Sequence, residues 1–209
     1  MQHDAAALGA AAAQRLVALG HTVIRPGLTD REFDAVEDRF GFRFSDDHRA
    51  FLAAGLPVWT EGDDDPDKTT DLAWPDWRDG DPAQLRRHID FASEGALEAV
   101  RNGYWHPWWG ADRPAQTAEA LRVAKDRLTA DGPLVPLYVH RFLPAGRGTW
   151  GHPVLSAWGV DVIFYGADLL DYIDREFDVS DDPDAEPKPW PAARNPYPDT
   201  FWVRIADRG

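Results

Sequence analysis

The stretch PVLSAWGVDVIFYG, residues 153–166, holds two apolar runs separated by a glycine. Val154–Trp158 and Val160–Tyr165 flank Gly159, and this arrangement predicts a β-hairpin whose second strand is buried. Leu134–Val139 is a further short apolar run and predicts a strand before the hairpin. The last third of the chain is therefore expected to form an antiparallel or mixed sheet.

Helical patterns surround these strands. After Gly166, Leu169, Ile173 and Phe177 line one face of a predicted helix, whereas Asp168, Asp171 and Asp174 are expected to point outward. Thr29 and Glu32 form a capping box before a helix that ends at Gly41. Other predicted helices cover residues 5–19, 45–54, 82–103 and 115–129, and short strand-like segments lie at 22–25 and 201–205, the latter a last strand or a docking segment. The predicted fold class is α+β, with helices on one side of the sheet.

Three regions differ in composition. Residues 1–21 are predicted to be an N-terminal helix, and residues 22–177 a core domain with a variable insertion around 60–132. Residues 178–209 are acidic and rich in proline and are interpreted as a C-terminal extension.

The charge balance restricts the class of partner. The 209 residues carry a formal net charge of −14, so general binding to nucleic acid is not expected because the chain repels phosphate. The acidity serves solubility or complements a basic partner. No apolar run has the length of a membrane span, the N-terminus lacks the basic residues of a signal peptide, and there is no cysteine. We expect a cytoplasmic protein.

No catalytic motif stands out. Ser156 lies within a predicted strand rather than in a nucleophile elbow, and no phosphate-binding or dinucleotide-binding glycine pattern is present. His140, His152 and Asp161 would meet as metal ligands if their strands are adjacent, but local hydrogen bonding is the favoured interpretation. We therefore expect no cofactor, no metal and no enzymatic activity.

Two features point toward a partner. The turn Tyr104–Gly110 is rich in large rings, which either fill the core or form a binding surface. The acidic run 63–67 is either solvated or, beside exposed Trp74 and Trp77, receives a basic protein surface. The candidate partner-binding residues are Asp63, Asp64, Asp65, Trp74, Trp77, Trp105, His106, Trp108 and Trp109.

Three blocks carry a resemblance to a known family: LVPLYVHRFLP (134–144), GHPVLS (151–156) and DVIFYGADL (161–169). They resemble the bacterial branch of the SMI1/KNR4 family, in the SUKH superfamily, and the segment 29–51 resembles the N-terminal helices of this family. His152 stands where the family more often has asparagine, and Phe164 where tyrosine is common. The family-motif residues, with mainly structural roles, are His140, Arg141, Pro144, Pro153, Ser156, Asp161, Tyr165, Gly166 and Asp168.

The resemblance implies an α+β fold without enzymatic activity. Many bacterial members are immunity proteins that neutralise a cognate toxin, often a nuclease, and fungal members are regulatory scaffolds. The expected function is therefore a protein-binding module that neutralises a toxin domain with a basic surface. The alternatives are a scaffold without a toxin partner, and a small-molecule sensor or hydrolase that uses His140, Arg141 and His152. Arg141 is expected to pair with a carboxylate.

Overall fold

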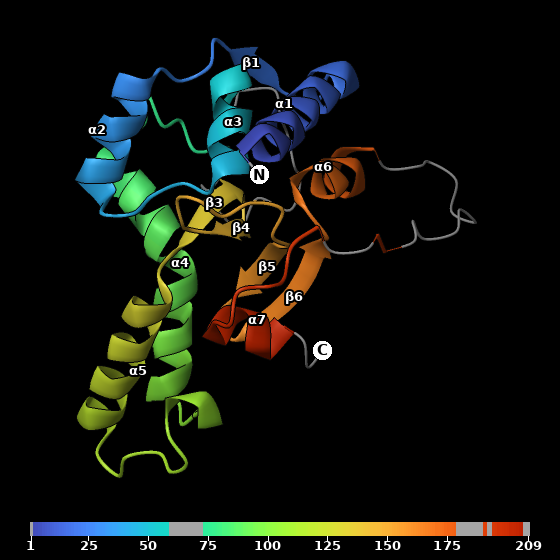
Figure 1. Cartoon of the computed structure of the whole chain (residues 1–209). Coiled ribbons are helices and arrows are strands. Elements are labelled where there is room, and N and C mark those ends of the chain that lie inside the picture. The colour runs from blue at the N-terminus through green and yellow to red at the C-terminus, as the bar shows by residue number, and fades with distance from the viewer. Residues whose placement is uncertain (1, 59–72, 179–189, 192–193, 207–209) are drawn as a thin grey trace.

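The structure is a computed structural model that describes residues 2–58, 73–178, 190–191 and 194–206 (Figure 1). The described residues form seven α-helices, one short 3-10 helix and two antiparallel sheets. The helices are α1 (Gln2–Leu19), α2 (Asp30–Phe40), α3 (Asp46–Ala54), α4 (Pro82–Arg101), η1 (Pro107–Trp109), α5 (Thr117–Asp131), α6 (Leu169–Phe177) and α7 (Phe201–Ala206). The strands are β1 (Val23–Arg25), β2 (Leu56–Val58), β3 (Leu134–Tyr138), β4 (Arg141–Pro144), β5 (Val154–Trp158) and β6 (Asp161–Gly166). The predicted α+β class is confirmed.

The larger sheet has the strand order β3-β4-β5-β6, and every neighbouring pair is antiparallel. The predicted hairpin around Gly159 is its β5–β6 pair, in which Trp158 lies opposite Asp161 and Ser156 opposite Ile163. Ser156 also lies opposite Arg141 of β4. Cross-strand partners share a face of the sheet, so these five side chains are placed on one face.

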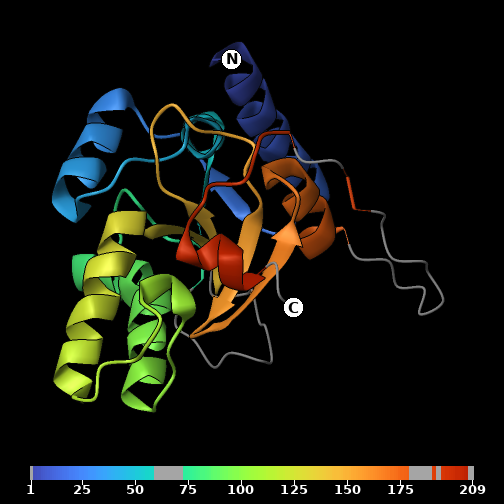
Figure 2. The same cartoon turned by 60° about the horizontal axis from the view of Figure 1, so that its bottom comes forward.

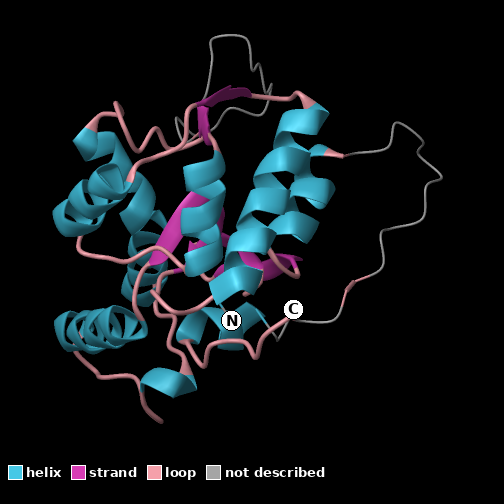
Figure 3. Cartoon of the chain, turned by 45° about the horizontal axis from the view of Figure 1, so that its top comes forward, coloured by secondary structure: helices cyan, strands magenta, loops and turns pink. Residues whose placement is uncertain are grey.

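Helices lie on both sides of this sheet, as the strands enclosed by helices in Figure 3 show. On one side, α1, α3 and α6 contribute to a core that includes Leu16, Phe51 and Tyr172 together with Leu143 of β4. On the other side, α4, α5 and α7 pack near residues of the opposite face, including Phe142, Leu155, Val162 and Phe201. Figure 2 shows the α4–α5 pair on one side of the molecule and α1 with α6 on the other. The expectation of helices on one side only is therefore wrong.

Several local predictions are confirmed. Thr29 accepts a hydrogen bond from the Glu32 amide while the Glu32 carboxylate accepts one from the Thr29 amide, so the capping box is present. α2 ends at Gly41, which adopts a left-handed conformation with φ 75°. Asp81 caps α4 by accepting a hydrogen bond from the Gln84 amide, 2.8 Å away. These signals were readable because each depends on residues only three or four positions apart.

Three local expectations need correction. Residues 201–206 form the helix α7 rather than a strand. Phe201, Trp202 and Ala206 of this helix are all buried in the core cluster beside the sheet, so the segment does dock against the rest of the domain. Asp168 does not point outward: it is buried and caps α6 by accepting hydrogen bonds from the Leu170 and Asp171 amides. The strand β4 was not predicted, because its four residues include a charge and a proline.

Candidate functional site

Arg141 is the centre of a polar network on one face of the sheet. Its Nε donates to Glu176 Oε2 at 3.1 Å, and its Nη1 donates to Ser156 Oγ at 3.0 Å. The guanidinium lies over the Tyr165 ring, with Cζ 3.7 Å from the ring centroid. The side chains of Arg141 and Glu176 are only 11% and 16% exposed, so this ion pair is shielded from water. The prediction that Arg141 pairs with a carboxylate is confirmed.

The network extends from β4, β5 and β6 to α6. Tyr172 of α6 is fully buried, and burial, followed by the charge of Glu176, raises the pKa of its phenol well above the ordinary value. The absence of a side chain at Gly166 allows α6 to pack closely against β6, because a Cβ at Gly166 would lie 2.6 Å from the Tyr172 Cβ. The motif residues Arg141, Ser156, Tyr165 and Gly166 thus join the sheet to α6. A guanidinium held by two partners and a ring is suited to fixing structure.

His140 lies in the turn between β3 and β4, directly before Arg141, and is not one of the hydrogen-bond partners of the Arg141 side chain. The turn is fixed from α4, where His88 Nε2 lies 2.6 Å from the Val139 carbonyl oxygen and Val139 has φ 48°. Burial lowers the pKa of both His88 and His140 to about 4, and the charge of Arg141 contributes at His140. Both imidazoles are therefore neutral at pH 7. The His140 ring meets the edge of Trp158, with centroids 5.9 Å apart.

His152 belongs to a different part of the molecule. It lies in the loop before β5 near Asp47 of α3, whose buried carboxylate accepts hydrogen bonds from the Gly151 amide at 2.8 Å and from the His48 amide. Burial lowers the pKa of His152 and raises that of Asp47. Within the described part of the chain, no group of three or more histidine and acidic side chains is arranged to hold a metal ion. The alternative of a joint His140–His152–Asp161 site therefore has no support in the geometry.

The remaining motif residues also have structural positions. Pro144 is buried at the end of β4 and Pro153 is buried just before β5. Asp168 pairs with Arg194 in addition to capping α6, so it connects this helix to the C-terminal segment. Asp161 is the exception, because its side chain is exposed at the start of β6.

Most of the predicted partner-binding rings fill the core. Trp74 stacks on Phe177 and Trp77 packs against Phe44, and both tryptophans are buried. The expectation that these two rings are exposed beside the acidic run is therefore wrong: folding places them over the aromatic residues of α2, α3 and α6. Asp63, Asp64 and Asp65 lie outside the described residues.

The aromatic turn 104–110 divides between core and surface. His106 and Trp109 are buried, and the Trp109 ring packs on Phe201 of α7 with centroids 4.6 Å apart. Trp105 is half-buried and donates from Nε1 to the Gly110 carbonyl. Among the aromatic rings of this turn, only that of Trp108 is exposed, and the Arg204 Cζ lies 3.8 Å from its centroid. Of the two interpretations, core filling applies to most of this turn.

The sheet face carries exposed apolar side chains that the sequence reasoning missed. Trp158 is 52% exposed and Ile163 is 46% exposed, and Asp161 lies opposite Trp158. We call Ser156, Trp158, Asp161 and Ile163 the hairpin face. The alternation of side chains along the two strands could have revealed this face. Once Val154–Trp158 and Asp161–Tyr165 are paired, the polar residues Ser156 and Asp161 indicate that their face of the sheet is partly solvated. Trp158 and Ile163 lie on the same face.

A groove of about 540 Å³ opens elsewhere, between the end of α2 and the β4–β5 loop. The buried Glu37 carboxylate lies there and accepts hydrogen bonds from Arg147 at 2.7 Å, from Arg43 and from the Phe44 amide. Asp38 also pairs with Arg43, so the charges of the groove largely neutralise one another. His140, Arg141 and His152 do not line it.

Comparisons with protein-family models, with curated proteins and with solved structures find no match to this chain. Across the described segments, none of the helices combines the length and the apolar character that a bilayer crossing requires.

Proposed function

We propose that this chain is a non-enzymatic protein-binding module that holds a partner with a basic surface through the hairpin face. The supporting observation is the pair of exposed side chains Trp158 and Ile163 beside the exposed carboxylate of Asp161. Large rings on a partly solvated surface are typical binding hot spots, and a net charge of −14 favours a basic partner. Trp108 and the acidic run 63–67 remain candidate secondary contacts.

The resemblance to the SMI1/KNR4 family suggests what the partner is. We propose a cognate bacterial toxin domain, such as a nuclease with a basic cleft, which this protein neutralises by occupying it. The proposed location is the cytoplasm. A scaffold role without a toxin uses the same binding surface, and a gene neighbourhood without toxins would favour it. The small-molecule alternative is weaker, because Arg141 is already engaged by Glu176 and Ser156 and His152 lies with Asp47.

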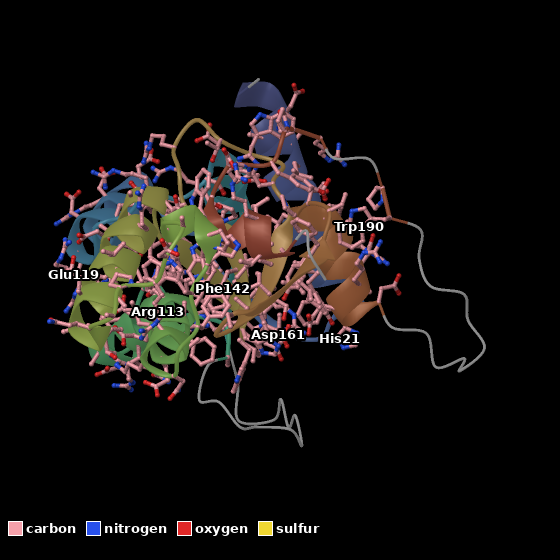
Figure 4. All side chains as sticks on the ribbon, turned by 90° about the horizontal axis from the view of Figure 1, so that it is seen from below. His21, Arg113, Glu119, Phe142, Asp161 and Trp190 are labelled. Atoms are coloured by element: carbon pink, nitrogen blue, oxygen red, sulfur yellow. The ribbon has the colours of Figure 1, made fainter. Side chains whose placement is uncertain are left out.

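The test is co-expression with the proteins encoded beside this chain, followed by co-purification and by growth assays of toxin neutralisation. The variant Trp158→Ala should weaken binding by about 2 kcal/mol or more, roughly thirtyfold, as loss of a hot-spot ring does. Trp190→Ala is the matched control, since Trp190 is 46% exposed. Figure 4 shows Trp190 well separated from Asp161 of the hairpin face.

Two outcomes would refute parts of the proposal. If a neighbouring toxin candidate neither binds nor is neutralised, the immunity function is wrong. If a partner binds Trp158→Ala and Trp190→Ala equally well, the hairpin face is not the contact.

A further inference from the structure

Two exposed tryptophans of this chain each carry an arginine over the ring, and each arginine also pairs with a carboxylate. The two arrangements, written as tryptophan, arginine and carboxylate, are Trp108–Arg204–Asp199 and Trp190–Arg175–Asp171. The arginine Cζ lies 3.8 Å from the ring centroid in the first and 4.6 Å in the second. The ion pairs measure 2.6 Å and 2.7 Å. A guanidinium shared between an indole and a carboxylate is therefore a recurrent arrangement on this surface.

Trp158 has the ring and the carboxylate of this arrangement. It is 52% exposed, more than Trp108 at 37% or Trp190 at 46%. It lies directly opposite the exposed Asp161 across the β5–β6 pair, so their Cβ atoms are about 5 Å apart at the usual cross-strand separation. Within the described segments, no arginine or lysine lies over the Trp158 ring or pairs with Asp161. The guanidinium that would complete the arrangement is not supplied by this part of the chain.

Two neighbouring rings hold the Trp158 side chain in place. Phe91 of α4 meets the indole with centroids 5.2 Å apart at an interplanar angle of 71°, and His140 meets it at 5.9 Å and 88°. Phe91 in turn stacks on Phe142, which is buried in the core. The indole is thus anchored on core residues while half of it stays exposed. A ligand that stacks on it does not have to order the ring first.

We propose that Trp158 and Asp161 bind an arginine side chain of the protein partner. This proposal rests on the proposed function and names the group of the partner that the hairpin face recognises. The guanidinium lies over the indole and donates to the Asp161 carboxylate, as Arg204 and Arg175 do with their own partners. Arginine is favoured over lysine, because a planar guanidinium stacks on a ring while its fork of donors reaches a carboxylate. The net charge of −14 attracts such a basic segment.

The test titrates the full chain with peptides and follows the assigned NMR signals of the Trp158 indole N–H and the Asp161 amide. The probe is an acetylated, amidated pentapeptide with arginine at its centre and two glycines on each side. Its twins carry lysine or citrulline, the uncharged isostere of arginine, at the same place. The arginine peptide should shift both signals saturably. The lysine peptide should bind about twofold or more weaker, and the citrulline peptide about tenfold weaker.

A pair of variants separates this site from general attraction to an acidic protein. Asp161→Asn should weaken binding of the arginine peptide by about threefold, as loss of an exposed charge pair does. Asp34→Asn makes the same chemical change at an exposed position on α2, which Figures 1 and 2 show well apart from β6, and should leave binding within experimental error. Trp158→Ala should remove the preference for arginine over lysine.

The remaining outcomes distinguish this proposal from the proposed function. Equal binding of the arginine peptide and either twin, or equal effects of Asp161→Asn and Asp34→Asn, overturns the arginine site. A neighbour-encoded partner that binds Asp161→Asn as tightly as the parent also overturns it, while the binding function stands. Selective binding of the arginine peptide without any neighbouring partner supports the arginine site and refutes the immunity function.

Discussion

His48 and His88 are both buried, yet their surroundings differ. His88 interacts with the Val139 carbonyl, whereas neither ring nitrogen of His48 has a hydrogen-bond partner among the described residues. His48 packs instead against the Phe44 ring, with centroids 5.0 Å apart. Burial lowers the pKa of His48 to about 3 and that of His88 to about 4. Both imidazoles must stay neutral for the core to remain intact.

The low pKa of His48 predicts acid sensitivity. Below the ordinary histidine pKa of about 6.5, the unfolded chain binds a proton at His48 that the folded chain does not. The free energy of unfolding therefore decreases as the pH is lowered, until the pH reaches the pKa of His48 in the folded chain. His48→Leu should reduce this slope by up to about 1.4 kcal/mol per pH unit, measured by urea unfolding between pH 7 and pH 4. An unchanged slope would contradict the assignment.

His88→Leu provides the comparison for that experiment. It should reduce the same slope, but it also leaves the Val139 carbonyl without its imidazole partner. The cost at pH 7 should therefore be about 1–3 kcal/mol, the usual cost of an unsatisfied buried group. Measuring both variants separates the proton-linked contribution from the hydrogen bond.

At the scale of elements, the crossing of α4 over the β5–β6 turn positions the hairpin face. Gly95 of α4 meets Gly159 of the turn so closely that a Cβ at Gly95 would lie 2.7 Å from the Gly159 Cα. Gly159 itself has φ 65°, which favours glycine. The sequence showed the turn glycine from its place between two strands, but Gly95 looks like an unfavourable residue inside a helix until the two backbones are seen in contact.

This contact predicts an unusual response to an alanine substitution. Gly95→Ala raises helix propensity by about 1 kcal/mol, yet it should destabilise the protein by about 1–3 kcal/mol because neither backbone can move away freely. Ser93→Ala on the same helix is the control, and it should change the urea midpoint little. A Gly95→Ala variant as stable as the parent would show that α4 and the hairpin can separate.

At the scale of the whole molecule, both ends of the described chain belong to the core. Leu16 of α1 is buried with residues of α3 and α6, and Arg15 pairs with Asp174 at 2.6 Å. At the other end, Phe201 and Trp202 of α7 complete the second core cluster. The helices α1 and α7 therefore contribute more to the packing of the domain than is implied by an N-terminal helix at 1–21 and a C-terminal extension at 178–209.

Removal of residues 1–21 should therefore unfold much of the domain. We expect loss of cooperative thermal unfolding, measured by near-UV circular dichroism, because α3 and α6 lose the helix that covers them. Arg15→Gln removes only partly exposed ion pairs and should leave the melting temperature close to the parental value. A truncated chain with the parental melting temperature would support a separate N-terminal helix.

The fold class, the hairpin around Gly159, the capped start of α2 and the carboxylate pairing of Arg141 could all be predicted from the sequence. These depend on alternation, on caps a few residues apart, or on the need of a charge for a partner. The burial of Trp74, Trp77 and Trp109 and the helical conformation of residues 201–206 became visible only in the folded chain. Burial and the conformation of a short apolar segment depend on contacts between residues far apart in the chain, and local patterns do not encode them.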